Sequence, residues 1–180
     1  MTEVAHGSNI RGRETQAVFR EGGFVLSNTS PGAAKNWVAS AQSSNLALVF
    51  AQLVVDSESC GVHAFLVPLR DEKGELLPGV QLEPMSRPGG LEGLDYSRLT
   101  FDAVKLGKEQ LLNRHAEIDS DGRYVCRLKT PGHRLNALLG TLVVGRGLLS
   151  SGASAGAKLA LSLAIRYAEK RRQFKNPKEQ

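Results

Sequence analysis

The sequence is poor in cysteine, histidine and tryptophan, with two, four and one of these residues in a chain of 180. Cys60 and Cys126 lack the spacing of metal ligands and the histidines are scattered, so the sequence gives no support for a zinc site. The chain also lacks a signal peptide. Together these absences predict reduced thiols in an intracellular compartment and no disulfide.

The charge is spread along the chain rather than gathered into blocks. The formal net charge is +5 and the isoelectric point is near 9.4, a balance that permits binding to nucleic acid or to a membrane surface. No RNA-binding or DNA-binding motif accompanies it, so we expect no nucleic-acid partner and regard an anionic ligand as sufficient. The exception is a cluster where a helix would end, where cations offset the helix dipole: Lys170, Arg171, Arg172, Lys175 and Lys178.

Two other functions are disfavoured by missing residues. Gly152-Ala-Ser-Ala-Gly156 has the spacing of a hydrolase nucleophile elbow, but no aspartate or histidine follows Ser154 to complete a triad. The apolar stretch from Leu135 to Ile165 approaches the length of a membrane span, but Arg146 and Lys158 interrupt it. We therefore expect neither a hydrolase nor a membrane-spanning protein.

The apolar pattern predicts an α+β fold. Short runs rich in β-branched and aromatic residues lie between turn signals such as Asp71-Glu-Lys-Gly74 and Asp119-Ser-Asp-Gly122, which is typical of an antiparallel β-sandwich or barrel. From about Leu135 the pattern changes to one long helix, expected to continue to residue 174 and to belong to an incomplete helical bundle. The predicted strands include Phe24–Leu26, Leu46–Val55, Val62–Leu69 and Leu99–Phe101.

Small residues recur every four positions along this helix. The spacing places them on one ridge, where a neighbouring backbone could approach closely. Because each glycine costs about 1 kcal/mol against alanine inside a helix, we expect a compensating contact and hence a buried bundle helix. The residues are Gly152, Gly156, Ala160, Ala164 and Ala168.

Three separated motifs follow one another along the chain. They are Met1-Thr-Glu-Val-Ala-His-Gly-Ser-Asn9, Lys35-Asn-Trp37 and Tyr167-Ala-Glu-Lys-Arg-Arg-Gln-Phe174. They resemble the Met-Thr-Glu-x-x-His-Gly-Ser-Asn motif, the start of the Lys-Trp-Trp-Pro-Gly-Gly motif and the Tyr-x-x-x-Arg-x-Gln-Phe motif of the acyl-CoA oxidase family, within the acyl-CoA dehydrogenase superfamily. Segments between Ala47 and Arg114 extend the resemblance over nearly the whole chain.

The resemblance implies an FAD-dependent enzyme that oxidises fatty acyl-CoA at the α and β carbons, with molecular oxygen as acceptor, in peroxisomal fatty-acid β-oxidation. It also implies a homodimer. The site residues it implies for FAD are Thr2, Gly7, Trp37 and Ala39, together with Arg171 and Phe174, which in the family reach the FAD of the partner subunit; Ser8 lies near the acyl-CoA.

The residue types suit these roles. A threonine hydroxyl at position 2 can serve the polar edge of a flavin, and Gly7 lets backbone approach a ligand without a clashing Cβ. The indole of Trp37 can cover a flavin face and donate its N–H.

No catalytic residue is expected in this chain. In acyl-CoA oxidases the catalytic glutamate lies downstream of the Arg-x-Gln-Phe segment, and the position used by some dehydrogenases falls here at Gly145-Arg146, which offers no carboxylate. We expect residues 1–128 to form the middle β domain and residues 129–180 to start an incomplete C-terminal helical domain. The chain alone is therefore predicted to be inactive.

A second hypothesis is a non-catalytic isoform or pseudoenzyme that acts as a binding module. It is favoured by two departures from the family pattern: Asn36 replaces the first tryptophan of the motif, and Val38-Ala39-Ser40 replace its Pro-Gly-Gly.

Overall fold

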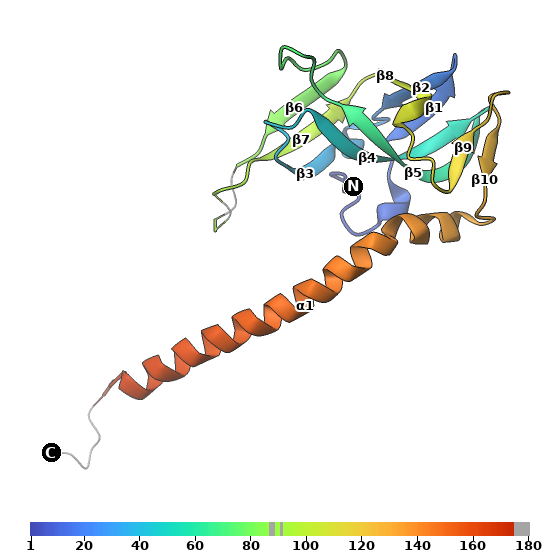
Figure 1. Ribbon diagram of the computed structural model, residues 1–180. Helices are drawn as coiled ribbons and strands as arrows, with labels where there is room; N and C mark the ends of the chain where they lie inside the picture. The colour runs from blue at the N-terminus through green and yellow to red at the C-terminus, as the bar shows by residue number, and fades with distance from the viewer. Residues whose placement is uncertain (87–88, 91, 175–180) are drawn as a thin grey trace. The chain divides into compact units, whose positions relative to one another are not determined.

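The computed structural model describes residues 1–86, 89–90 and 92–174 (Figure 1). It divides into two compact units, Met1–Leu138 and Leu139–Gln180. The first unit holds the β-strands and short 3-10 helices, and the second is formed by most of one long helix. This arrangement confirms the predicted α+β class. The predicted domain boundary after residue 128 stays a prediction.

Five strands form the larger sheet, in the order β5-β4-β1-β2-β8. Strand β4 buries every second side chain from Ala51 to Val55, as expected for a strand with one face on a core, whereas Val49, Phe50 and Ala51 are buried in succession. The strands are β1 (Gln16–Arg20), β2 (Gly23–Ser27), β4 (Leu46–Val55), β5 (Glu58–Pro68) and β8 (Val104–Gly107).

Three further strands form a second sheet in the order β3-β7-β6, and two more form a small hairpin. The strands are β3 (Lys35–Ala39), β6 (Val80–Pro84) and β7 (Tyr96–Phe101) in the sheet, and β9 (Ala116–Ile118) and β10 (Tyr124–Cys126) in the hairpin. The 3-10 helices are η1 (Ile10–Gly12), η2 (Pro31–Ala33) and η3 (Lys108–Gln110).

Two details of the predicted sandwich or barrel were wrong. The sheets are separate and do not close into a barrel. Strand β1 pairs with β4 in parallel, with Gln16 opposite Gln52, whereas the sequence prediction was antiparallel. The segment between β2 and β4 explains the parallel pair, because it is long enough to carry the chain back to the edge of β1 and places β3 in the other sheet on the way.

One hydrophobic core joins the two sheets. Its largest fully buried side chains are Phe24 on β2, Phe65 on β5 and Phe101 on β7. The rings of Phe24 and Phe65 meet edge to face, with 5.2 Å between their centroids, a favoured aromatic arrangement. Aliphatic residues from both sheets, such as Leu53 and Leu99, complete this core. It makes the β unit a rigid support for the segments on its surface.

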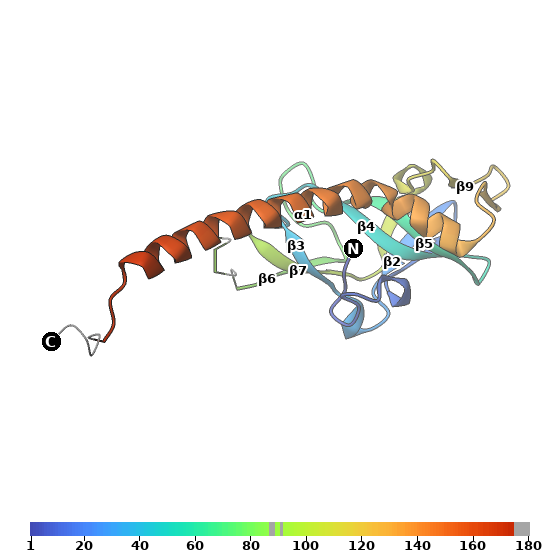
Figure 2. The ribbon, with the colours of Figure 1, turned by 90° about the horizontal axis from the view of Figure 1, so that it is seen from below.

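Helix α1 runs from Pro131 to Lys170 (Figures 1 and 2). The predicted range from about Leu135 to residue 174 was therefore displaced at both ends. The helix begins earlier because the Thr130 hydroxyl accepts the His133 N–H at 3.2 Å and proline is well suited to the first helical position. The last helical bond is donated by Arg171 N–H to the Tyr167 carbonyl at 2.8 Å.

Among the residues that the structure describes, the small-residue ridge of α1 is exposed, so its burial in a helical bundle stays a prediction. A Cβ added at Gly152 or Gly156 would meet no described atom within 4 Å.

By length and composition alone, the segment Leu142–Lys170 could cross a membrane, with a mean hydropathy of 1.4. This is a weak sign of membrane insertion, because apolar helices of soluble proteins pass the same test. Arg146 and Lys158 lie within the segment, and each would cost about 3 kcal/mol near the centre of a bilayer. The absence of a membrane span stays a prediction.

Candidate functional site

The first residues of the chain are fixed against β3 and η2 by backbone hydrogen bonds. Glu3 forms a β-bridge with Lys35. The N–H groups of Val4 and Ala5 donate at 3.0 Å to carbonyls of Ala34 and Gly32, and Asn36 N–H donates to the Thr2 carbonyl at 3.2 Å. The opening motif and the tryptophan motif, far apart in sequence, therefore lie side by side.

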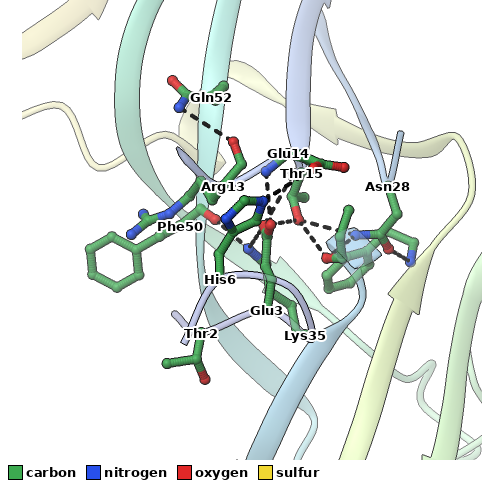
Figure 3. Close-up of polar contacts among 12 residues, drawn as sticks. Thr2, Glu3, His6, Arg13, Glu14, Thr15, Asn28, Lys35, Phe50 and Gln52 are labelled. Carbon is green, nitrogen blue, oxygen red and sulfur yellow. Dashed lines mark hydrogen bonds and ion pairs between the residues drawn. The ribbon is translucent and has the colours of Figure 1, made fainter. Parts of the chain in front are cut away.

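A buried ion pair secures this junction (Figure 3). The Lys35 ammonium lies 2.8 Å from the Glu3 carboxylate, with side-chain exposures of 3% and 0%. It also donates to the Phe50 carbonyl at 2.7 Å. The Glu3 carboxylate accepts further bonds from Glu14 N–H at 2.7 Å and from the Thr15 N–H and hydroxyl at 3.1 and 2.6 Å. Both charges are thus well paired inside the fold.

The burial and the bonds shift both pKa values. Burial alone would raise the pKa of Glu3, but the hydrogen bonds from Lys35, Thr15 and Glu14 bring it below its ordinary value. Burial lowers the pKa of Lys35 to about 8, against the opposing effect of its bond to Glu3. The pair remains ionised at neutral pH, so it acts as a structural clamp.

Polar side chains next to the pair connect it to the second sheet. The Asn28 amide donates to the Ala33 carbonyl at 2.7 Å and to the Thr15 hydroxyl at 3.0 Å. Its oxygen accepts Phe101 N–H at 2.6 Å. Sequence reasoning did not find this network, because its members are single polar residues whose partners are distant along the chain.

A smaller polar group closes the loop that contains Gly7 and Ser8. The His6 ring lies 3.1 Å from the Glu14 carboxylate, and Glu14 also accepts the Ser30 hydroxyl. These bonds hold the loop at both ends, while Gly7 and Ser8 between them are exposed. A Cβ added at Gly7 would meet no described atom within 4 Å. The chain's own packing therefore does not explain a glycine there.

Trp37 interrupts β3 in an unusual backbone conformation. Its φ is 59°, in the left-handed region that is rare for bulky residues. The β3–β7 register shifts between Lys35 and Val38. The indole is 54% exposed and meets Tyr96 edge to face, with 5.7 Å between ring centroids. The fold thus holds a large aromatic side chain outward at a conformational cost of about 1–3 kcal/mol.

Thr2 is hydrogen-bonded to Asn36, the residue before this tryptophan. Its hydroxyl donates to the Asn36 carbonyl at 2.9 Å, so it shares the backbone junction that presents Trp37. The side-chain oxygen of Asn36 is buried and has no hydrogen-bond partner among the residues that the structure describes. Ala39, at the end of β3, is exposed and pairs with Tyr96.

The remaining predicted FAD residues belong to the second unit. Arg171 and Phe174 lie beyond the end of α1, and Phe174 is 92% exposed. Its φ is 64°. Two members of the predicted basic cluster, Lys175 and Lys178, lie outside the described residues.

A hollow of about 210 Å³ lies elsewhere on the β unit and contains none of the predicted site residues. Its lining combines η1, β4, β5 and the first turns of α1, represented by Arg11, Gln52, Val62 and Leu135. No sequence motif pointed to it, since its residues are individually ordinary and meet only in the fold.

Comparison with known proteins gives consistent matches. The family model described as "Acyl-CoA dehydrogenase, middle domain" matches residues 1–104. An acyl-coenzyme A oxidase-like protein of Mus musculus is 40% identical over 99% of this chain and 28% of its own length. The peroxisomal acyl-coenzyme A oxidase 3 of Arabidopsis thaliana is 38% identical over 97% of this chain and 26% of its own.

Solved structures give the same result. An acyl-CoA oxidase from tomato, Lycopersicon esculentum, matches with a TM-score of 0.84 and 32% identity over 97% of this chain and 27% of that one. Acyl-CoA oxidase-2 of Caenorhabditis elegans, bound with FAD, ascaroside-CoA and ATP, matches with a TM-score of 0.82 and 32% identity over 99% and 27%. The chain thus spans about a quarter of the length of these relatives.

Proposed function

The chain belongs to the acyl-CoA oxidase family of the acyl-CoA dehydrogenase superfamily, and from this membership we propose that it forms part of the flavin site of an acyl-CoA oxidase. The whole protein would oxidise fatty acyl-CoA with FAD as cofactor and oxygen as acceptor. Relatives named as peroxisomal oxidases support a place in peroxisomal fatty-acid β-oxidation.

The observation that carries the proposal is the exposed, strained Trp37, in the segment to which Thr2 is bonded through Asn36. Backbone strain of this kind persists where the surrounding structure enforces it, and it is concentrated at binding sites. Here Lys35, buried beside Glu3, fixes the residues before the tryptophan. The open space at Gly7 and the unpartnered, buried Asn36 oxygen also fit a polar, planar ligand at this junction.

Each residue then has a physical role toward FAD, whose flavin ring would accept the hydride from the substrate when bound. Trp37 would cover one face of the ring and exclude water from it. Thr2 would offer its hydroxyl oxygen to the polar edge of the ring, and Gly7 and Ala39 would allow close approach. Ser8 would face the acyl-CoA.

Arg171 and Phe174 would act on the FAD of a second copy in a homodimer. A guanidinium is suited to phosphate oxygens because it presents several N–H donors in one plane. Both side chains are exposed, so a second copy could reach them.

One observation favours the alternative of a non-catalytic binding module. The Thr2 hydroxyl donates its hydrogen to the Asn36 carbonyl, so it can only accept a further bond from a ligand. Such a site could hold a flavin weakly, or serve to pair the β unit with a longer relative.

Visible absorbance of the purified chain after FAD addition and gel filtration tests cofactor binding. We expect co-eluting flavin absorbance, and Trp37→Ala to weaken FAD binding about tenfold. The matched control is Leu112→Ala, which trims another exposed apolar residue of the β unit and leaves binding unchanged. Absence of flavin from the wild-type chain would favour the binding module.

Activity is tested separately. Because no carboxylate occupies the Gly145-Arg146 position, we expect the isolated chain to produce no hydrogen peroxide from palmitoyl-CoA, even with FAD bound. Oxygen-dependent peroxide formation would contradict this expectation and require a base elsewhere.

A further inference from the structure

His6 differs from its neighbours in the opening loop because its side chain is turned into the fold. Within the described segment from Val4 to Asn9, every other residue is exposed, whereas the His6 side chain is 17% exposed. Its Nδ1 atom lies 3.2 Å from the position that a Cβ on Gly12 would take. The imidazole therefore lies against the backbone of η1, on the inner side of the loop.

The imidazole is held by Glu14, at the other end of this loop (Figure 3). The His6 Nε2 atom lies 3.1 Å from the Glu14 carboxylate, which also accepts the Ser30 hydroxyl. The hydrogen bonds from Ser30 and His6 lower the pKa of Glu14, so the carboxylate is ionised at neutral pH and can only accept. His6 Nε2 must therefore carry a hydrogen and donate it, which fixes the orientation of the ring.

Glu14 is itself fixed to the β unit through its backbone. Its N–H donates to the Glu3 carboxylate at 2.7 Å, and Glu3 belongs to the buried pair with Lys35. Its carbonyl accepts the Thr29 hydroxyl at 3.0 Å. Since Glu14 is held in this way, its bond to His6 ties the loop to the same rigid support.

The loop that follows His6 offers free donors. The N–H groups of Gly7, Ser8 and Asn9 form no hydrogen bond with the residues that the structure describes, and the next backbone bond is donated by Ile10 to the Ser8 carbonyl at 2.9 Å. Successive free N–H groups in a turn are suited to anionic or carbonyl oxygens. Their directions depend on the backbone that enters the loop, and His6 holds that backbone.

We propose that His6 is a positioning residue, which through its bond to Glu14 holds the loop Gly7–Asn9 in the conformation that receives FAD and acyl-CoA. This role rests on the proposed function, which assigns ligands to the loop. Loss of the imidazole leaves the hydrophobic core and the buried ion pair intact, so the chain still folds. It lowers the fraction of chains whose loop is ready to bind, and the apparent Kd rises in the same proportion.

Titration of FAD fluorescence with the full 180-residue chain tests the role toward the ligand. His6→Ala should raise the Kd for FAD about fivefold. His6→Gln should restore most of the affinity, because the glutamine amide nitrogen reaches about as far as Nε2 and can donate to Glu14, whereas the shorter His6→Asn should not. Glu14→Ala should match His6→Ala, and the chain with both substitutions should bind no more weakly than either single variant.

A matched control and a second measurement separate this role from the proposed function. His133→Ala, at an exposed site on α1, should leave the Kd for FAD unchanged. Arg11 is exposed and lies in η1, directly after the loop, so tryptic cleavage there reports local opening of the ligand-free chain. Mass spectrometry of the fragment that ends at Arg11 should show faster cleavage in His6→Ala than in wild type, His6→Gln or His133→Ala.

Several outcomes would overturn the proposal. An FAD affinity of His6→Ala equal to that of wild type would do so even if cleavage at Arg11 became faster, and so would a failure of His6→Gln to restore binding. A wild-type chain that binds no FAD would reject the proposed function, and equal cleavage at Arg11 in all variants would then reject the contact between His6 and the loop as well. Should His6→Ala fail to fold, the comparison of His6→Asn with His6→Gln decides the matter.

Discussion

Replacing Lys35 with methionine should unfold much of the site, because Lys35 is one half of the buried pair that joins the opening segment to β3. Methionine keeps the length of the side chain and its apolar stem but removes the ammonium. The Glu3 carboxylate would then remain inside the fold with 0% side-chain exposure and without a counter-ion. The Phe50 carbonyl would lose its bond from Lys35 as well.

The expected loss of stability depends on the hydrogen bonds that the Glu3 carboxylate retains in the Lys35→Met variant. Removing one member of a buried ion pair typically costs about 3–5 kcal/mol. Three bonds to Glu3 survive, from Glu14 N–H and from the N–H and hydroxyl of Thr15, so we expect about 3 kcal/mol. With a urea m-value of about 2 kcal/mol/M, the unfolding midpoint should fall by about 1.5 M.

Urea unfolding followed by tryptophan fluorescence measures this change, since Trp37 is the one tryptophan and lies two residues from Lys35. Lys105→Met, at an exposed site on β8, is the control and should change stability by no more than about 0.5 kcal/mol. Adding Glu3→Leu to Lys35→Met should recover part of the loss, because the orphaned charge is removed. A loss below about 1 kcal/mol in the single variant would refute the view that the pair is the clamp of the site.

Further predictions concern single groups. The pKa of Glu3 in the folded chain lies below its ordinary value of 4.5. Its contribution to stability is therefore complete above pH 4.5 and is lost as the pH falls through the folded pKa. In urea titrations, the free energy of unfolding of Glu3→Gln should depend less on acidic pH than that of the wild type. Burial lowers the pKa of His63 below 6.5. Because the unfolded chain then binds more protons just below pH 6.5, the free energy of unfolding should fall as the pH is lowered through this range. An NMR titration midpoint at or above 6.5 for His63 would contradict this prediction. Burial raises the pKa of the Cys60 thiol above 9.0, so iodoacetamide at pH 8 should alkylate Cys126 first, as followed by mass spectrometry. Arg13→Leu should stabilise the chain by about 1–3 kcal/mol, since it removes a buried cation whose guanidinium has no hydrogen-bond partner among the described residues. A loss of stability in urea would contradict this reasoning.

Local patterns in the sequence were enough to predict the class of the fold and its family. The apolar run Leu46–Val55 predicted a strand, and β4 covers the same residues. The three separated motifs indicated the acyl-CoA oxidase family, which the matches confirm. The roles assigned to Thr2, Gly7, Ser8, Trp37, Ala39, Arg171 and Phe174 remain predictions. The structure brings Thr2 to the strand that carries Trp37 and Ala39.

Only the tertiary structure determines which contacts hold these motifs in place and which of their side chains are exposed. No short-range pattern foretells that Glu3 will pair with Lys35, because such a pair forms only when the fold closes the loop between them. The left-handed conformation of Trp37 also depends on its neighbours, since its own propensity opposes it. The local pattern of the amino acids was thus enough to predict the strands, the helix and the family, because periodicity and motifs are local properties of the sequence. The burial of Glu3 and Lys35 and the strain at Trp37 arise only from contacts between residues that are distant along the chain.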